Sequence, residues 1–294
     1  WPATGGGFTR GGSTIAMAKT GTQTVNFLNG EDIFSLTVND GSTTQLFCHN
    51  DTGGALDVYG DLTVNELLKA HVSASNSNVT MKTSARTMTV GSDVRTTALA
   101  QLYRITLDFA GTMSIPESTH KRIILTSTAG VITATGDLTI TEELELANAC
   151  EFTSNGNDIT AKLIDIQSGG IFILSEGDTI TFIDISGCGF GSSAGTFNSL
   201  GASGNRNTIT SGGGSGVSNR FDATQNMTQT MTHTTMSYGA NWGPGTGTCN
   251  ITNCTFDNMS GYAVNLSGST TIAAFNNNTI SNSSHGISCG EPHA

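Results

Sequence analysis

A short motif recurs along this chain about every twenty residues and constrains the fold more than any other feature. In each copy, turn-forming residues precede an aspartate, and a run typical of a β-strand follows. Asp137, Asp158 and Asp178 keep this interval. Such a period indicates stacked repeats, because a single unit of this size cannot bury its apolar face without neighbours above and below it.

A longer duplication supports the same fold. The stretch from Gly60 to Leu67 recurs from Gly136 to Leu144, and an Asn-rich turn and another strand pattern follow each copy. Thr, Ile and Val suit a half-buried pleated surface, and Asn and Gly tolerate left-handed bends. We expect an all-β chain, a right-handed parallel β-helix (β-solenoid) with coils of about 20–24 residues. Only residues 65–71 and 142–148 have a helix-like pattern.

Changes in residue composition and in the regularity of the repeat predict four segments. We expect an N-terminal extension or cap over residues 1–30 and a β-solenoid with the duplicated motif over 31–189. Residues 190–222 are rich in Gly and Ser and are expected to form a loop or a loosened coil. Residues 223–294 are expected to resume regular β-helix repeats.

The last of these segments carries a resemblance to a known family. Residues 253–264 align with residues 277–287 in a pattern of Asn, a small residue and an apolar residue, then Asn, a bend, Gly and an apolar residue. This pattern resembles the repeats of right-handed parallel β-helices of the pectate-lyase-like superfamily. Residues 201–242 resemble β-helix regions of phage appendage proteins, such as tailspikes, and of bacterial surface proteins. The resemblance implies an extracellular or virion-surface location but selects no activity, because lyases, hydrolases and adhesins share this fold.

One stretch raises the question of catalysis. His285 lies in Ser-His-Gly-Ile-Ser, which is similar to the Gly-His-Gly-Ile-Ser element of polygalacturonase-type glycoside hydrolases. Glycosidases also need two carboxylates, which that family takes from Asn-Thr-Asp and Asp-Asp elements. Neither element occurs here, and only Asp257 lies in the preceding coil. We therefore predict no catalytic residue and favour a non-enzymatic protein. An extracellular polysaccharide lyase or glycoside hydrolase is the alternative.

We predict no cofactor and no metal ligands, with one alternative. Asp165 and Asp184 each precede an isoleucine in strands one coil apart, so they could stack on one face. Stacked like charges repel, and a bound Ca²⁺ would offset that repulsion. Acids on a solvated outer face are the simpler interpretation.

The cysteines are expected to be small buried core residues. Their spacing does not suit zinc, and an even number of six leaves disulfides open, with Cys249, Cys254 and Cys289 the favoured participants.

Charge and surface aromatics limit the partners. Twelve Lys and Arg against 23 Asp and Glu give a net charge of −11, which disfavours nucleic acid. No apolar run is long enough for a membrane-spanning helix. Tyr238, Trp242 and Tyr262 come close in the expected register and could bind sugar faces, or could instead cover an apolar coil edge. Both ends of the sequence look uncapped. We therefore expect copies of the chain to pair with each other, and cell-surface polysaccharide to be a second partner.

Overall fold

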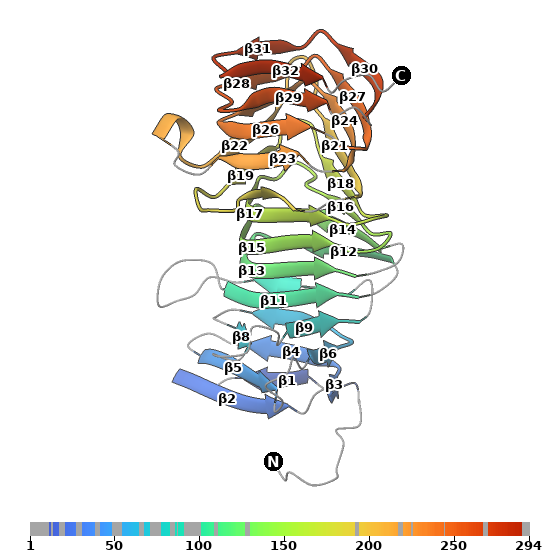
Figure 1. The fold of residues 1–294 in the computed structure, drawn as a ribbon. Coiled ribbons are helices and arrows are strands. Elements are labelled where there is room, and N and C mark those ends of the chain that lie inside the picture. The colour runs from blue at the N-terminus through green and yellow to red at the C-terminus, as the bar shows by residue number, and fades with distance from the viewer. Residues whose placement is uncertain are drawn as a thin grey trace.

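The chain is stacked into a parallel β-solenoid in a computed structural model, which confirms the predicted all-β solenoid fold. The structure describes residues 12, 14–17, 21–27, 31–38, 42–48, 55–64, 68–70, 78–82, 86, 88–90, 101–108, 111–126, 130–191, 194–216, 220–224, 226–243, 245–266 and 270–289. Figure 1 shows an elongated molecule whose N-terminal and C-terminal coils lie at opposite ends of the stack.

One face of the solenoid is built from two sheets that follow each other along the axis. The first contains β1 (Thr14–Met17), β4 (Ser35–Val38), β7 (Leu62–Val64) and β10 (Met88–Val90). The second contains β12 (Gly111–Ile115), β14 (Gly130–Ala134), β16 (Glu151–Thr153), β18 (Ile171–Leu174), β21 (Thr196–Leu200), β24 (Thr228–Thr232), β27 (Thr248–Thr252) and β30 (Thr271–Asn276).

The other faces carry longer or paired strands. In the lower part these are β2 (Gly21–Phe27), β3 (Glu31–Ile33), β5 (Ser42–Cys48), β6 (Ala55–Val58), β8 (Leu68–Ala70), β9 (Asn78–Met81), β11 (Gln101–Leu107), β13 (Ser118–Leu125), β15 (Leu138–Leu146) and β17 (Ile159–Ile166). Above β17 each turn has two shorter strands: β19 (Thr179–Phe182) and β20 (Gly189–Phe190), β22 (Asn207–Ser211) and β23 (Phe221–Thr224), β25 (Thr234–Ser237) and β26 (Gly239–Gly243), β28 (Thr255–Asp257) and β29 (Tyr262–Leu266), then β31 (Thr279–Ser281) and β32 (His285–Cys289).

The core consists of ladders of inward side chains at equivalent positions of successive coils. One ladder runs through Ile159, Ile180, Ile209, Met236 and Phe256, all fully buried. Parallel, in-register pairing puts the same strand position of every coil at the same place in the cross-section. A similar residue type is therefore needed at each level, which is why the sequence repeats.

A second ladder is aromatic. Phe152, Phe172 and Phe197 are in register on β16, β18 and β21, and their ring centroids lie 5.1 and 5.7 Å apart. Above them the same position holds Gln229 of β24 and then Cys249 of β27, both fully buried. The aromatic column thus fills the middle coils and gives way to smaller side chains above.

The repeated aspartates join one coil to the next. The Asp137 Oδ1 atom accepts a hydrogen bond from the backbone N–H of Asp158 at 2.9 Å. Asp158 Oδ1 in turn accepts one from Thr179 N at 2.8 Å. Asp178 is buried and accepts hydrogen bonds from Gly156 N, at 2.9 Å, and from the Ser154 hydroxyl. The interval in the sequence therefore reflects carboxylates that satisfy bend N–H groups of adjacent coils.

Asparagines occupy the left-handed bends, as the sequence predicts. The asparagines with positive φ have values from 49 to 60° and are Asn148, Asn155, Asn253, Asn258, Asn277 and Asn282. Asn is among the few non-glycine residues that tolerate this conformation.

The two helix-like patches contain strands; residues 65–67 and 71 of the first patch lie outside the described residues. Residues 68–70 form β8, and Glu142 to Leu146 lie within β15. A bulge after Ile140 resets the alternation, so that Leu144 and Leu146 point inward. Glu142 and Glu143, which lie between Ile140 and Leu144, remain on the outer face, where Glu142 pairs with Lys121 at 2.9 Å. These two consecutive outward acids interrupt the alternation of a strand, and the sequence of this stretch therefore resembles that of a helix.

The predicted segment boundaries fall within the stack. The strands β1 and β2 of residues 1–30 pair with β4 and β5 of the next coil. Residues 190–222 contain β21, β22 and a short 3₁₀ turn, Gly214–Gly216. In the part of the chain that the structure describes, no helix is long and apolar enough to cross a membrane.

Five cysteines, Cys150, Cys188, Cys249, Cys254 and Cys289, are free, so the disulfide alternative does not hold for Cys249, Cys254 or Cys289. The thiols of Cys150, Cys188, Cys249 and Cys254 are buried, as expected for core residues, whereas Cys289 is exposed.

Candidate functional site

The last described coil leaves apolar ladder positions uncovered. Ile272 of β30 is 52% exposed, although its register partner Cys249 is fully buried. Ile287 of β32 is 46% exposed, and its partner Val264 is fully buried. These isoleucines occupy the interior register and are exposed because no described coil lies above them. We call the surface formed by Ile272, Phe275, Ile280 and Ile287 the terminal face.

Backbone groups are also uncovered at this end. Within the described strands, β30 pairs only with β27, β31 only with β28 and β32 only with β29. Each therefore has one edge with no described strand beside it, and a row of backbone donors and acceptors on such an edge is a template for a further strand. The terminal face thus combines apolar side chains with an unpaired β edge.

An aromatic pair lies next to the terminal face. Tyr262 begins β29 and His285 begins β32, and their ring centroids are 5.0 Å apart with planes tilted by 47°. Tyr262 is 40% exposed and its backbone N–H donates to Asn241 Oδ1 at 2.9 Å. The two rings form a small exposed aromatic surface, which is the kind of surface that can contact the apolar face of a sugar.

Tyr238 lies at a different place in the coil. Its φ is 59°, and it occupies the bend that Asn258 occupies one coil later, four residues before Tyr262. The Arg220 guanidinium lies 6.0 Å from the Tyr238 ring centroid, and its Nη1 donates to the Asn258 carbonyl. The Tyr238 ring therefore stacks on a cation that stabilises the next bend, and it does not extend the pair formed by Tyr262 and His285.

Trp242 is a core residue, and the expectation that it offers a face to sugars is wrong. Its side chain is fully buried, and its Nε1–H donates to Gln229 Oε1 at 2.9 Å. It packs edge-on against Phe190 with centroids 5.8 Å apart. The strand β26 directs the indole into the interior, where its ring centroid lies 6.0 Å from that of Phe197, the last ring of the aromatic column.

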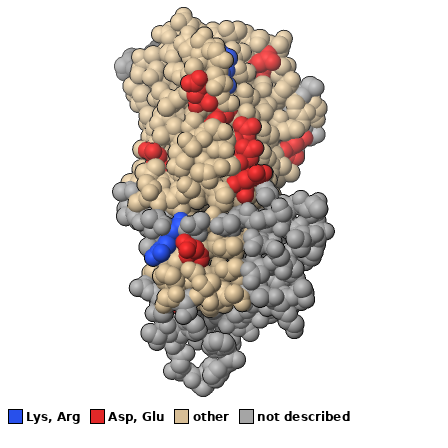
Figure 2. All heavy atoms as spheres, turned by 180° about the vertical axis from the view of Figure 1, so that it is seen from behind, with Lys and Arg blue, Asp and Glu red and all other residues tan. Residues whose placement is uncertain are grey.

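Asp165 and Asp184, considered above as an alternative Ca²⁺ site, are not register partners. Asp165 of β17 is in register with Glu145 of β15. In the next coil, the residue that lies against Asp165 is Gly191. Asp184 lies in the bend after β19. No group of three or more His, Cys, Asp or Glu side chains among the described residues could hold a metal ion. Figure 2 shows acidic side chains spread in a band along the axis, with few cations on that face.

Asp257, the acid in the coil that precedes His285, is held as an anion. Hydrogen bonds from the Ser281 hydroxyl, at 2.7 Å, and from Asn282 and Asn258 keep the pKa of Asp257 below its usual value. A glycosidase acid needs a raised pKa to carry its proton at neutral pH. Asp257 is on β28, whereas His285 begins β32 and contacts Tyr262. This geometry gives Asp257 a bend-stabilising role.

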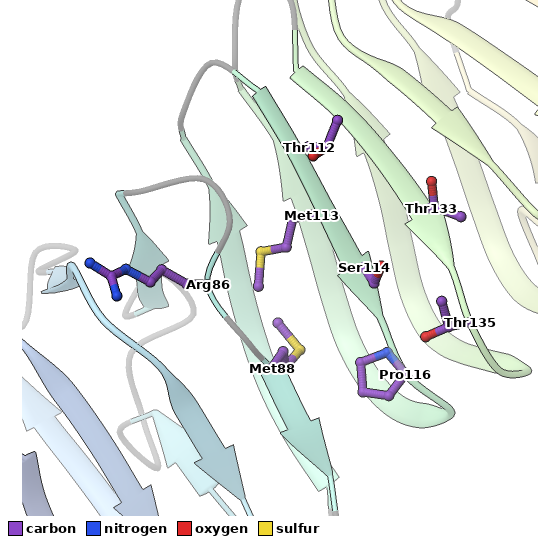
Figure 3. A pocket seen from close by; sticks show the side chains of 8 residues that line it. All are labelled: Arg86, Met88, Thr112, Met113, Ser114, Pro116, Thr133 and Thr135. Atoms are coloured by element: carbon purple, nitrogen blue, oxygen red, sulfur yellow. The ribbon is translucent and has the colours of Figure 1, made fainter.

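A cavity of about 400 Å³ opens lower in the stack, between β10 and β12. Figure 3 shows Met88 and Met113 projecting into it from the two sides, and Arg86 extending away from the methionines. The Arg86 guanidinium lies 5.1 Å from the Phe34 ring centroid. The remaining lining residues are Thr112, Ser114, Pro116, Thr133 and Thr135.

Sequence reasoning expected uncapped ends but did not identify the residues of the terminal face, and it missed the cavity. The register partners of Ile272 and Ile287 could have marked them as interior positions, but only if the pairing of β27 with β30 and of β29 with β32 had been known. No signal in the sequence marks the cavity. No protein-family model, curated protein or solved structure shows a significant match to this chain.

Proposed function

We propose that this chain is a structural and adhesive β-solenoid module of a phage appendage or an extracellular filament, and that it assembles through its end coils. The observation that carries the proposal is the terminal face, where the interior residues Ile272 and Ile287 are about half exposed beside unpaired strand edges. Burying such side chains stabilises an association by about 25 cal/mol per Å² of apolar surface.

The opposite end of the described stack has complementary edges. The strands β1, β2 and β3 pair only with β4, β5 and β6 among the described strands. Because the strands are parallel, the two ends differ, and a contact between them is heterologous. Such contacts propagate head to tail, which is the geometry of a shaft or filament.

The experiment compares the wild type with Ile272→Lys and Ile287→Lys by size-exclusion chromatography with light scattering. We expect concentration-dependent association of the wild type and a monomer for each variant, because a buried unpaired ammonium is costly. Leu200→Lys is the matched control, since Leu200 is 45% exposed at the end of β21, away from the terminal face. A wild type that stays monomeric at millimolar concentration contradicts the proposal.

Adhesion to surface glycans is the second part of the proposal and is supported by the exposed pair of Tyr262 and His285. Glycan-array binding that is lost in Tyr262→Ala and retained in Tyr238→Ala supports it. The alternative function is an extracellular polysaccharide lyase or glycoside hydrolase, favoured only by the sequence around His285. Incubation with acidic polysaccharides separates the two: new reducing ends or unsaturated products would establish the enzyme.

A further inference from the structure

The solenoid has a discontinuity on one face. In coil order β10 precedes β11 as β12 precedes β13, yet among the described strands β10 pairs only with β7 and β12 only with β14. The cavity lined by Met88 and Met113 lies at this boundary (Figure 3). We call the boundary between β10 and β12 the seam. The neighbouring face is continuous at the same level, because β11 pairs with both β9 and β13.

A histidine is buried in the coil that lies above the seam. His120 of β13 is 1% exposed, and its neighbours in register are Leu102 of β11 and Ile140 of β15. Its Nε2 lies 2.8 Å from the Ser118 hydroxyl, and Ser118 Oγ is 2.8 Å from the Pro116 carbonyl oxygen. Pro116 itself lines the cavity. A chain of hydrogen bonds therefore links the buried imidazole to the wall of the seam.

This chain fixes the tautomer of the imidazole. The Ser118 hydroxyl has one proton, and the Pro116 carbonyl can only accept, so the hydroxyl donates to Pro116. Ser118 Oγ must then accept from His120, which places the ring proton on Nε2. His120 Nδ1 has no hydrogen-bond partner among the described residues. A second proton would have to sit on this nitrogen, in the interior and without an acceptor.

The charged groups on the adjoining strands do not compensate that proton. Lys121 pairs with Glu142, and Arg122 pairs with Glu143 at 2.7 Å and with Glu145, all on the outer side of β13 and β15. Burial lowers the pKa of His120 to about 3, from an ordinary value of 6.5. Since the folded pKa is depressed, the stabilisation from a neutral His120 is complete above pH 6.5 and is lost as the pH falls toward 3.

We propose that the seam is an acid-sensitive hinge, at which protonation of His120 separates β12 from β10 while the continuous sheet through β9, β11 and β13 keeps the two parts of the solenoid joined. The seam is where opening costs least, because no ladder between described strands has to break there on that face. Opening exposes Met88 and Met113 and releases Pro116, the acceptor at the end of the hydrogen-bond chain that holds the imidazole in the interior.

Because the hinge breaks no ladder hydrogen bond between described strands, the test follows the side chains that opening exposes. It measures the rate at which hydrogen peroxide oxidises each methionine of the intact chain from pH 7.5 to 4.5, by mass spectrometry of its peptides. If the open state has an ordinary histidine pKa, its population rises about tenfold per pH unit below about pH 6. We expect this acceleration at the buried Met88 and Met113, whereas the fully buried Met231 and Met236 of the upper coils keep their protection. The wild type alone is sufficient to reject the proposal: equal acceleration at the methionines of all coils, or no acceleration at Met88 and Met113, overturns it.

Two variants assign the effect to the imidazole. His120→Gln keeps a polar side chain that does not titrate, and it should abolish the pH dependence of oxidation at Met88 and Met113. His233→Asn removes a different histidine, at a bend where later coils carry asparagine, and should leave the dependence unchanged. A pH dependence that persists in His120→Gln, or disappears in His233→Asn, overturns the assignment to His120.

Discussion

Asp158 accepts a hydrogen bond from the backbone N–H of Thr179, which lies one coil further along the solenoid, at 2.8 Å. The same relation joins Asp137 to Asp158. A bend N–H has no ladder partner, so a carboxylate from the neighbouring coil satisfies it and fixes the spacing of the two coils. The repeated aspartate is therefore a connection between coils.

Asp158→Ala should lower the free energy of unfolding by about 0.5–1.5 kcal/mol, because the Thr179 N–H loses its acceptor. Chemical denaturation at neutral pH measures the change. Asp158→Asn is the control, since its amide oxygen can still accept, and it should cost less than the alanine variant. Equal losses in the two variants would show that charge, and not the hydrogen bond, is responsible.

Phe172→Ala should destabilise the protein by about 3–5 kcal/mol, because it leaves a cavity between two fully buried rings. Phe172 lies between Phe152 and Phe197, at centroid distances of 5.1 and 5.7 Å. Phe172→Leu keeps most of the volume and should cost clearly less in the same thermal or chemical denaturation experiment. A loss below 1 kcal/mol in Phe172→Ala would contradict a continuous aromatic column.

Gln229 and Trp242 should be energetically coupled. Gln229→Leu leaves the buried Trp242 Nε1–H without its acceptor and should cost about 1–3 kcal/mol. Trp242→Phe removes the donor and leaves a smaller ring. In a double-mutant cycle, the double variant should be more stable than the sum of the single losses predicts, by about 0.5–3 kcal/mol. Strict additivity would mean that this hydrogen bond does not contribute.

His233→Asn should stabilise the protein by up to about 1 kcal/mol. His233 has a φ of 45° at the bend where the next two coils carry Asn253 and Asn277. Asn tolerates this conformation better than His does. The reverse change, Asn253→His, should destabilise the protein by a similar amount. The idea fails if both substitutions shift the melting temperature in the same direction.

The sequence predicted the elements that depend on local chemistry. Asp137, Asp158 and Asp178 marked the coils, and asparagines such as Asn253 and Asn277 marked the left-handed bends. These features can be recognised because each coil repeats the same local requirement. Inward and outward positions were less predictable. The bulge after Ile140 moves Leu144 inward and leaves two consecutive acids outside, which resembled a helix in the sequence.

By itself the sequence determined the repeat, the strand-forming segments and hence the parallel solenoid, because these follow from local backbone preferences and from the need of each coil to bury its apolar side. Only the tertiary structure decided that Trp242 lies in the core, that Tyr262 stacks on His285 and that Ile272 is exposed. It also decided where β10 and β12 part. These properties depend on which coil lies above or below a residue, and coil lengths vary: the step from Phe172 to Phe197 is 25 residues, and that from Phe197 to Gln229 is 32. Such variable insertions displace the register between coils without leaving a periodic signal in the chain.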